Sequence, residues 1–389
     1  MSNILSLFPK TYEASRERFR GNLTVIQKYW PNAQLTHHEI KRDEDLTIDW
    51  ITSDELEVNE KVFILTTAEH GIEGYVGSAM MQRFFDKFLS RLDPRTTGLL
   101  LVHTINPWGM KYHRRVNRNN VDLNRTFVWD NSFDTSINPA YDKLLDIIQA
   151  DKPLTNLMLS NIFYYLKLVQ KVFQLGWPAF KRASLLGQYR HPNGLFYGGK
   201  GYQEETKVMI DLYRKAFRIY NHILHLDLHT GYGPRYQMSL VNSVHEKRSS
   251  KEFVDMFNYP LVVAANAQEF YAIQGDMVDY EYQMWRHDFP EKKFFATAFE
   301  FGTYSDKIKG RVGMQQAMSF ENRLYWQGGD NEKLAAKVRQ NFEELFNPAA
   351  PDWREKAIQD SDQAFEGILR AEEYIHEKEL HNPNPPVQH

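Results

Sequence analysis

The stretch Val62-Phe-Ile-Leu-Thr-Thr-Ala-Glu-His-Gly-Ile-Glu73 changes from a mostly apolar run to a polar segment that contains acids and a histidine. A short apolar run followed by polar residues is typical of a buried strand in an α/β sheet. Three further runs have the same form, and they lie at residues 98–104, 223–228 and 294–299. The sequence therefore predicts four buried strands.

Helices are predicted beside these strands. Between the first two strands, apolar residues recur at helical spacing, at Val76, Met80, Phe84, Phe88 and Leu92. Residues 3–30 and 204–220 also have a helical pattern. Because strands and helices alternate, we expect a three-layer α/β/α domain around a mixed, largely parallel sheet.

The chain of 389 residues is long enough for one large domain with additions to it. We assign residues 1–346 to a catalytic domain, and the less regular residues 129–202 to an insertion that covers one face. Residues 347–389 are predicted to form a helical C-terminal extension. Its end, from Asn382 onward, is rich in Pro and Asn and is expected to be disordered.

The composition excludes several classes of chemistry. The chain has no cysteine, so disulfides, thiolate zinc sites and a cysteine nucleophile are all excluded, and a metal must be held by His, Asp and Glu. The formal net charge of -3 gives no reason to expect nucleic acid or an anionic membrane as a partner. Since neither a secretory signal nor a membrane span is recognisable, we expect a cytoplasmic protein.

Polar residues follow three of the four predicted strands. His70 and Glu73 follow the first, His229 follows the third, and Glu300 follows the fourth. Ligand sites in open α/β sheets gather at the carboxyl ends of the strands, so these segments can converge. Two histidines and a carboxylate form an open zinc site, in which the fourth position holds a water whose pKa falls to about 7. The alternatives are a chance His-x-x-Glu spacing and a strand-end histidine that is bonded to backbone.

A basic, amide-rich loop lies at residues 114–127, after the second strand, and holds four arginines. Arginine binds carboxylates through two hydrogen bonds and stabilises developing oxyanions. The alternatives are a solvated basic loop and a loop that binds phosphate or nucleic acid. The absence of a wider basic pattern in the sequence disfavours nucleic acid.

Four motifs together resemble the zinc carboxypeptidase family over about residues 55–330. They are His70-Gly-Ile-Glu73, Arg115-x-Asn-x-Asn-x-Val-Asp-Leu-Asn124-Arg125, Leu226-Asp-Leu-His229-Thr-Gly and Glu300. The second motif is close to its form in the murein-peptide amidases, and it is more loosely similar to that of the aspartoacylase and succinylglutamate desuccinylase relatives. Segments around residues 193–199, 226–234 and 300–304 resemble a set of bacterial carboxypeptidase-like proteins still more closely.

The resemblance implies one zinc ion per chain, with His70, Glu73 and His229 as its ligands. It also implies that Glu300 is the general base of the reaction. Zinc and this carboxylate together imply a hydrolase that acts on amide or peptide bonds.

The resemblance further implies roles in substrate binding for the basic loop. Arg115 matches the arginine that polarises the scissile carbonyl, and Arg118 competes with it because related deacylases use a slightly different offset. Asn124 and Arg125 match the pair that holds the free carboxylate of the substrate. The expected substrate is therefore a peptide or an N-acyl amino acid with a free carboxylate.

Two features of the family pattern stay open in the sequence. The assisting tyrosine has three candidates, Tyr271, Tyr280 and Tyr282. The family lines its side-chain pocket with the stretch before the catalytic glutamate, where acids favour a basic substrate side chain and Met and Trp favour an apolar one. In this chain the stretch contains Asp276, Asp279, Glu281, Met284 and Trp285.

The leading hypothesis is a metallocarboxypeptidase-type hydrolase. A deacylase or amidase that acts on a small N-acyl amino acid or a cell-wall peptide uses the same machinery and remains an alternative. A binding protein that has lost catalysis is a lesser alternative, because Glu300 is present. Phosphoryl chemistry is disfavoured because the chain lacks a Gly-rich phosphate loop.

Overall fold

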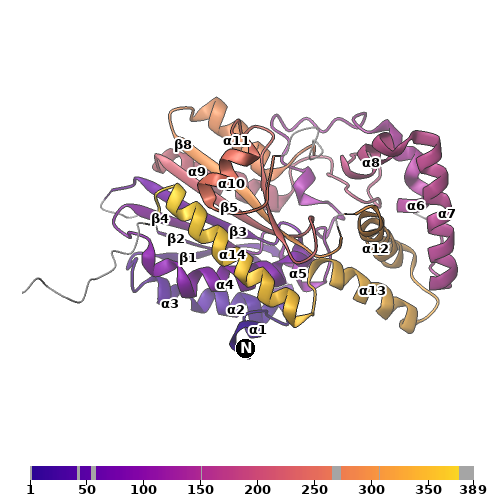
Figure 1. Cartoon of the computed structure of the whole chain (residues 1–389), viewed down its shortest axis with the longest axis horizontal. Helices are drawn as coiled ribbons and strands as arrows, with labels where there is room; N and C mark the ends of the chain where they lie inside the picture. Colours follow the sequence, from indigo (N-terminus) through magenta and orange to yellow (C-terminus); the bar gives the residue numbers. More distant parts are fainter. Residues whose placement is uncertain are drawn as a thin grey trace, which may run out of the picture.

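The four predicted strands form the centre of one sheet in the computed structural model, which describes residues 2–41, 44–53, 58–149, 151–264, 273–305 and 307–375. They lie in the order β4-β3-β5-β8 and all run parallel (Figure 1). The bounds of these strands are β3 Lys61–Thr67, β4 Thr97–His103, β5 His222–Gly231 and β8 Lys293–Gly302.

Two pairs of strands extend this centre to an eight-stranded sheet of order β1-β2-β4-β3-β5-β8-β6-β7. The added strands are β1 Gln34–Lys41, β2 Leu46–Ser53, β6 Met238–Asn242 and β7 Val262–Ala264. β2 pairs antiparallel with β4, and β6 pairs antiparallel with β8, so the sheet is mixed around a parallel centre. The predicted fold class is confirmed. The apolar runs did not reveal the added strands, which are short or contain many polar residues.

Side chains alternate between the two faces of the sheet and build two cores. Phe63 and Leu65 of β3 lie in the first core, and Val62 and Ile64 lie in the second. Helices that cover the first face are α1 Ser2–Leu5, α2 Tyr12–Gly21, α3 Leu23–Ile26, α4 Gly74–Lys87, α10 Ser250–Phe257 and α14 Pro351–Ala371. Helices α9 Glu204–Ile219 and α11 Met277–Asp288 cover the second face. The molecule therefore has the three layers that the sequence predicts.

A further hydrophobic cluster lies in a lobe beside the sheet, at the right of Figure 1. Its helices are η5 Pro139–Leu144, α6 Leu145–Ile148, α7 Leu157–Leu175, α8 Trp177–Leu185, α12 Ile308–Gln327 and α13 Glu332–Phe346. The predicted insertion thus packs against α12 and α13. Short elements near the sheet are η2 Gly71–Glu73, η3 Leu89–Arg91, α5 Pro107–Lys111 and η4 Leu123–Arg125. Within the described ranges, no helix combines the length and the apolar character needed to cross a membrane.

Helix α14, in the segment predicted as a C-terminal extension, packs closely on the first core. Trp353 Nε1 donates a hydrogen bond to the carbonyl of Gly302 at 2.8 Å, and Phe365 is fully buried. At Gly367 the helix touches the end of α10 so closely that an added Cβ would lie 1.9 Å from the carbonyl oxygen of Phe257. Residues 376–389, which include the predicted disordered end, lie outside the described residues.

We expect Gly367→Ala to lower the free energy of unfolding by about 1–3 kcal/mol, because the methyl group meets backbone that cannot move away. This loss should outweigh the gain of about 1 kcal/mol that alanine brings to a helix. Gly21→Ala is the matched control, because nothing lies within 4 Å of an added Cβ at that helical position. Chemical denaturation of both variants measures the difference. Equal stabilities would contradict the close approach of α14.

Candidate active site

The carboxyl ends of the central strands bring the candidate residues together. His229 of β5 and Glu300 of β8 are direct partners in the parallel register. Asp227 lies two residues before His229 in the same strand and therefore on the same face of the sheet. η2, which follows β3, carries Glu73, and His70 caps the N-terminus of η2.

The carboxylate of Glu73 lies between the two histidines. Its Oε1 is 2.9 Å from His70 Nδ1, and its Oε2 is 3.0 Å from His229 Nδ1. The backbone N–H of Thr230 donates to Oε2 at 2.9 Å. Burial opposes the charged form of Glu73, but the two histidines outweigh it and hold the pKa of Glu73 below its usual range. The three predicted ligands are thus in mutual contact and almost fully buried.

The spacing of Glu73 from each ring is compatible with a tetrahedral zinc site. With bonds of about 2.1 Å, the ligand atoms of such a site lie about 3.4 Å apart, and one oxygen of Glu73 lies 2.9 Å from His70 Nδ1 while the other lies 3.0 Å from His229 Nδ1. His70 Nδ1 is buried and makes no hydrogen bond within the described part of the chain, although Glu73 lies beside it. A buried nitrogen that is aimed at carboxylate oxygen without hydrogen-bond alignment is consistent with a metal ligand.

Two further carboxylates hold the opposite ring nitrogens. Asp122 Oδ1 lies 3.1 Å from His70 Nε2, and Asp227 contacts His229 Nε2. Carboxylates in this position fix the ring orientation and the tautomer of metal-binding histidines. Both Nδ1 atoms are therefore left to face Glu73.

Glu69 is a second acid close to the candidate ligands. Its Oε2 lies 3.7 Å from His229 Nε2, and Glu69, His70 and His229 can each offer one atom within 4.8 Å of the others. Both oxygens are buried and have no hydrogen-bond partner among the described residues, and burial raises the pKa of Glu69 well above its usual value. Glu73 is the better placed of the two acids, because it faces both rings and Glu69 competes with Asp227 for one.

Glu300 lies beside the candidate ligands with few contacts of its own. The backbone N–H of Tyr232 donates to its Oε2 at 3.4 Å. Burial raises the pKa of Glu300 to about 7, a value suited to proton exchange near neutral pH.

Of the two competing arginines, Arg115 is the one that contacts the candidate ligands. Its Nη1 lies 3.2 Å from Glu73 Oε1, and its Nε lies 3.1 Å from Asp122 Oδ2, while Arg118 is exposed. The carbonyl of Arg115 also accepts a hydrogen bond from Gly71 N at 3.1 Å. The arginine loop and η2 therefore form one unit.

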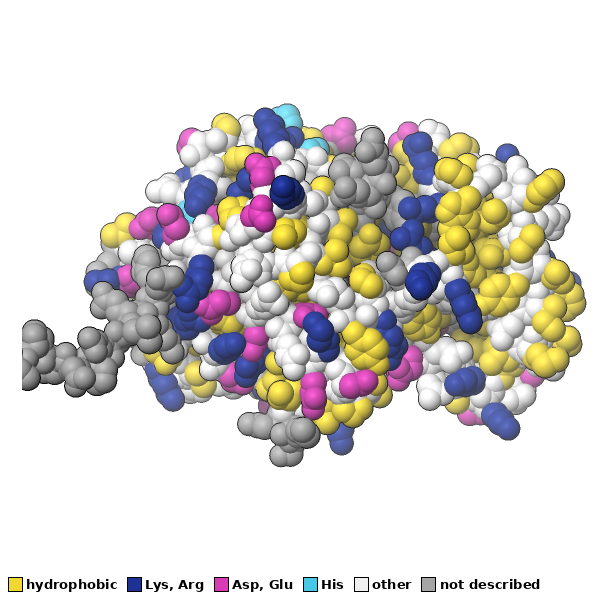
Figure 2. All heavy atoms as spheres, viewed as in Figure 1, with side chains coloured by type: hydrophobic (Ala, Val, Ile, Leu, Met, Phe, Trp, Pro, Cys, Tyr) yellow, Lys and Arg dark blue, Asp and Glu magenta, His cyan; other side chains and the backbone are white. Residues whose placement is uncertain are grey.

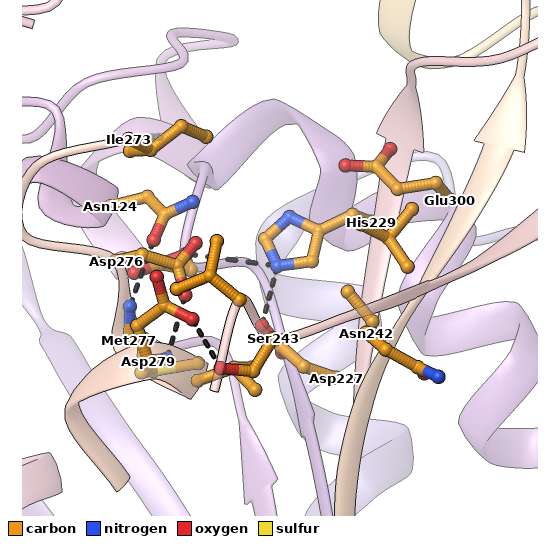
Figure 3. A pocket seen from close by; sticks show the side chains of 15 residues that line it. Asn124, Asp227, His229, Asn242, Ser243, Ile273, Asp276, Met277, Asp279 and Glu300 are labelled. Atoms are coloured by element: carbon orange, nitrogen blue, oxygen red, sulfur yellow. Dashed lines mark hydrogen bonds and ion pairs between the residues drawn. The ribbon is translucent and has the colours of Figure 1, made fainter. Parts of the chain in front are cut away.

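The predicted carboxylate-binding pair is divided in the structure. Asn124 lines a cavity next to His229, and its Oδ1 accepts a hydrogen bond from the N–H of Met277 at 3.0 Å (Figure 3). Arg125 is buried, and its guanidinium donates to the carbonyl of Asn124 at 2.7 Å and to that of Leu185 at 3.0 Å. Leu185 belongs to the insertion. The insertion therefore accepts a hydrogen bond from the guanidinium that, by the resemblance, is expected to bind the substrate carboxylate.

The cavity itself is small and acidic, with a volume of about 60 Å³. Asp276 and Asp279 line it from the stretch predicted to set specificity (Figure 3). Burial raises the pKa of Asp279 to about 7. The other candidates of that stretch lie in the second core, where Glu281 contacts His225 at 2.5 Å and Met284 and Trp285 pack with the helices.

The described tyrosine candidates lie away from the cavity. Tyr280 and Tyr282 are buried at 3% and 1% exposure in the second core, and the hydroxyl of Tyr282 donates to Glu246 at 3.0 Å. Tyr271 lies outside the described residues.

Sequence reasoning missed the acids that surround the ligands. Asp227 was detectable because a spacing of two residues in a strand places it on the face of His229. Asp122 lies within the Val-Asp-Leu-Asn motif, but its contact with His70 joins residues that are 52 positions apart. Glu69 gave no signal beyond its place next to His70.

The chain belongs to the family described as "Protein of unknown function (DUF2817)", whose match covers residues 8–360. No curated protein matches its sequence.

Three of the solved structures that are similar to this chain are a carboxypeptidase A, a fibrinolysis inhibitor and an aspartoacylase family protein. Carboxypeptidase A from Helicoverpa armigera is 13% identical, with a TM-score of 0.45 over 79% of this chain and 72% of that chain. Bovine thrombin-activatable fibrinolysis inhibitor is 13% identical, with a TM-score of 0.44 over 84% of this chain and 95% of that chain. An aspartoacylase family protein from Mesorhizobium loti is 13% identical, with a TM-score of 0.35 over 77% and 68% of the respective chains.

We expect purified protein to bind one zinc ion per chain and Glu73→Ala to lose it, because that change removes the carboxylate shared by both rings. Glu69→Ala is the matched control, a neighbouring buried acid whose removal should leave the metal in place. Elemental analysis and competition with a chelator measure content and affinity. If only the Glu69 variant loses the metal, Glu69 and not Glu73 is the carboxylate ligand. Absence of metal from the unaltered protein would refute the site.

Proposed function

We propose that this protein is a zinc-dependent hydrolase that cleaves an amide or peptide bond next to a free carboxylate. The observation that carries the proposal is the convergence of both histidine Nδ1 atoms on Glu73, while Asp122 and Asp227 hold the opposite nitrogens. A zinc ion bound there would acidify the attacking water and polarise the scissile carbonyl.

Glu300 is proposed as the general base and acid. Its carboxylate takes a proton from the attacking water and returns that proton to the leaving amine. The pKa of about 7 supports this exchange, because the group can both accept and release a proton near neutral pH. Its register position opposite His229 places it beside the candidate ligands.

Arg115 is proposed to stabilise the oxyanion that forms at the scissile carbonyl. It already lies against Glu73 at the candidate ligands. A preorganised donor of this kind contributes roughly 3–4 kcal/mol to transition-state stabilisation.

Substrate binding is proposed to use the free carboxylate and a cationic side chain. Asn124 lines the cavity, and Arg125 can join it by exchanging the carbonyl of Leu185 for the substrate carboxylate. Asp276 and Asp279 in the cavity wall favour a positively charged group on the substrate. Substrates that carry a small positively charged group near the free carboxylate are therefore the first to test.

A deacylase or amidase that acts on a small N-acyl amino acid is the second candidate. The small cavity and the contact of Arg125 with Leu185 favour it, because they leave little room for a large residue. A binding protein without catalysis is less well supported, because the proposed general base Glu300 is present and is the register partner of His229.

We expect Glu300→Gln to lower turnover at least about 100-fold, because the amide keeps the shape of the side chain but cannot accept the proton. Steady-state kinetics on the best substrate of a peptide and N-acyl amino acid screen measures the loss. Zinc content and melting temperature should match those of the unaltered protein. Turnover that survives the change would place the base elsewhere.

We expect amidation of the substrate carboxylate to lower kcat/KM roughly 30- to 3,000-fold, because losing one partner of a buried charged contact costs about 2–5 kcal/mol. Arg125→Met should cause a similar loss on the free acid and little further loss on the amide, because both changes remove the same contact. The exposed Arg118→Met is the matched control and should be neutral. If the unaltered protein cleaves the amide as fast as the acid, the deacylase or amidase hypothesis replaces this one.

A further inference from the structure

Helix α7 of the insertion presents an apolar face to solvent. Two of its residues, Tyr164 and Leu168, are buried against the lobe. The large apolar side chains that it exposes are Met158, Leu159, Ile162, Phe163, Tyr165, Leu166, Val169 and Phe173, with exposures between 42% and 91%. Figure 2 shows hydrophobic side chains gathered along the edge of the molecule where Figure 1 places α7. Soluble proteins seldom leave a continuous apolar patch of this kind without a partner.

The periodicity of α7 shows that this face is continuous. Met158, Ile162, Leu166, Val169 and Phe173 recur every three or four residues and form one stripe along the helix. In the remaining described helices of the molecule, the apolar stripe faces a core, but here the larger apolar stripe faces outward and a smaller one faces the lobe.

The charge around α7 is an independent observation. Residues 152–203 contain seven basic residues and no acidic residue, in a chain whose net charge is -3. The basic residues are Lys152, Lys167, Lys171, Lys181, Arg182, Arg190 and Lys200. Asp146, from before this segment, pairs with Lys167 and Lys171 at 3.6 and 3.0 Å, and Asp142 pairs with Arg190 at 2.8 Å. Lys152 and Arg182 are exposed and make no ion pair with the described residues.

These two features together select one kind of partner. A second copy of the chain would bring its own exposed Lys152 and Arg182 to the same contact, and these like charges would repel. A membrane surface with anionic lipid offers negative headgroups that can bind Lys152 and Arg182, and an apolar layer that can accept the stripe of α7. Basic amphipathic helices with Phe and Leu on the apolar side bind such surfaces in this way.

We propose that α7 docks this protein on the surface of a membrane that contains anionic lipid. The helix lies flat with its apolar stripe in the outer layer, since no described helix can span a bilayer. Its 19 residues cover about 28 Å of surface at about 1.5 Å per residue. Lys152, which precedes α7, and Arg182 of α8 contact the lipid headgroups. This inference does not depend on the proposed hydrolase activity.

Flotation of the full chain with vesicles tests the proposal. We expect binding to vesicles of phosphatidylcholine with phosphatidylglycerol, weaker binding when salt is raised, and little binding to phosphatidylcholine alone. Leu166→Gln combined with Phe173→Gln should weaken partitioning at least about tenfold, because two inserted side chains lose apolar contact. Lys152→Gln combined with Arg182→Gln should weaken it about 30-fold, because each cation contributes about fivefold.

Val58→Gln combined with Met256→Gln is the matched control, because both side chains are exposed, at 57% and 38%, on elements outside the lobe. It should leave partitioning unchanged, and thermal melting should show that all variants fold. Absence of binding to the anionic vesicles would overturn the proposal, as would equal loss in the control. A dimer in solution that the Leu166 and Phe173 changes convert to monomer would also overturn it, and would assign the face to self-association.

Discussion

The site depends on one carboxylate that is shared by two histidines. Glu73 reaches both Nδ1 atoms from η2, which is packed tightly against its neighbours. At Gly71, in this turn, an added Cβ would lie 2.1 Å from the backbone of Gly109 in α5. The N–H groups of Gly71 and Ile72 donate to the carbonyls of Arg115 and Arg114. A side chain on residue 71 would separate η2 from the arginine loop, so the geometry of the candidate site depends on a backbone contact.

Negative charge accumulates around this carboxylate. Glu69, Asp122, Asp227 and Glu300 are all close to the two rings, and Arg115 is the cation that contacts Glu73 and Asp122. Buried like charges repel strongly where the dielectric constant is low. Burial raises the pKa values of Glu69 and Glu300, and repulsion from the neighbouring carboxylates adds to this effect. A divalent cation between the rings would offset the same charge, so electrostatics and donor geometry favour the same occupant.

The insertion acts on both sides of the molecule. On its inner side, the carbonyl of Leu185 holds Arg125 away from the cavity that Asn124 lines. On its outer side, α7 exposes an apolar stripe within an acid-free basic segment. The overall charge of -3 averages over this uneven distribution, so the composition by itself gives no reason to expect an anionic membrane as a partner. Net charge averages over the chain, whereas a partner meets only one face.

The sequence alone predicted the central layer and the convergence of the candidate site residues. Four apolar runs identified β3, β4, β5 and β8, and the polar residues after them identified His70, Glu73, His229 and Glu300 as neighbours, because parallel strands bring their carboxyl ends to one edge. Only the tertiary structure decided what surrounds these residues. Arg115, and not Arg118, contacts Glu73, and Asp122 contacts Nε2 of His70. The apolar stripe of α7 faces solvent and not a core. The hydrophobic periodicity of a segment shows which of its residues share one face of a helix or strand. Whether that face packs against a core or lies in solvent depends on segments that are distant in the sequence.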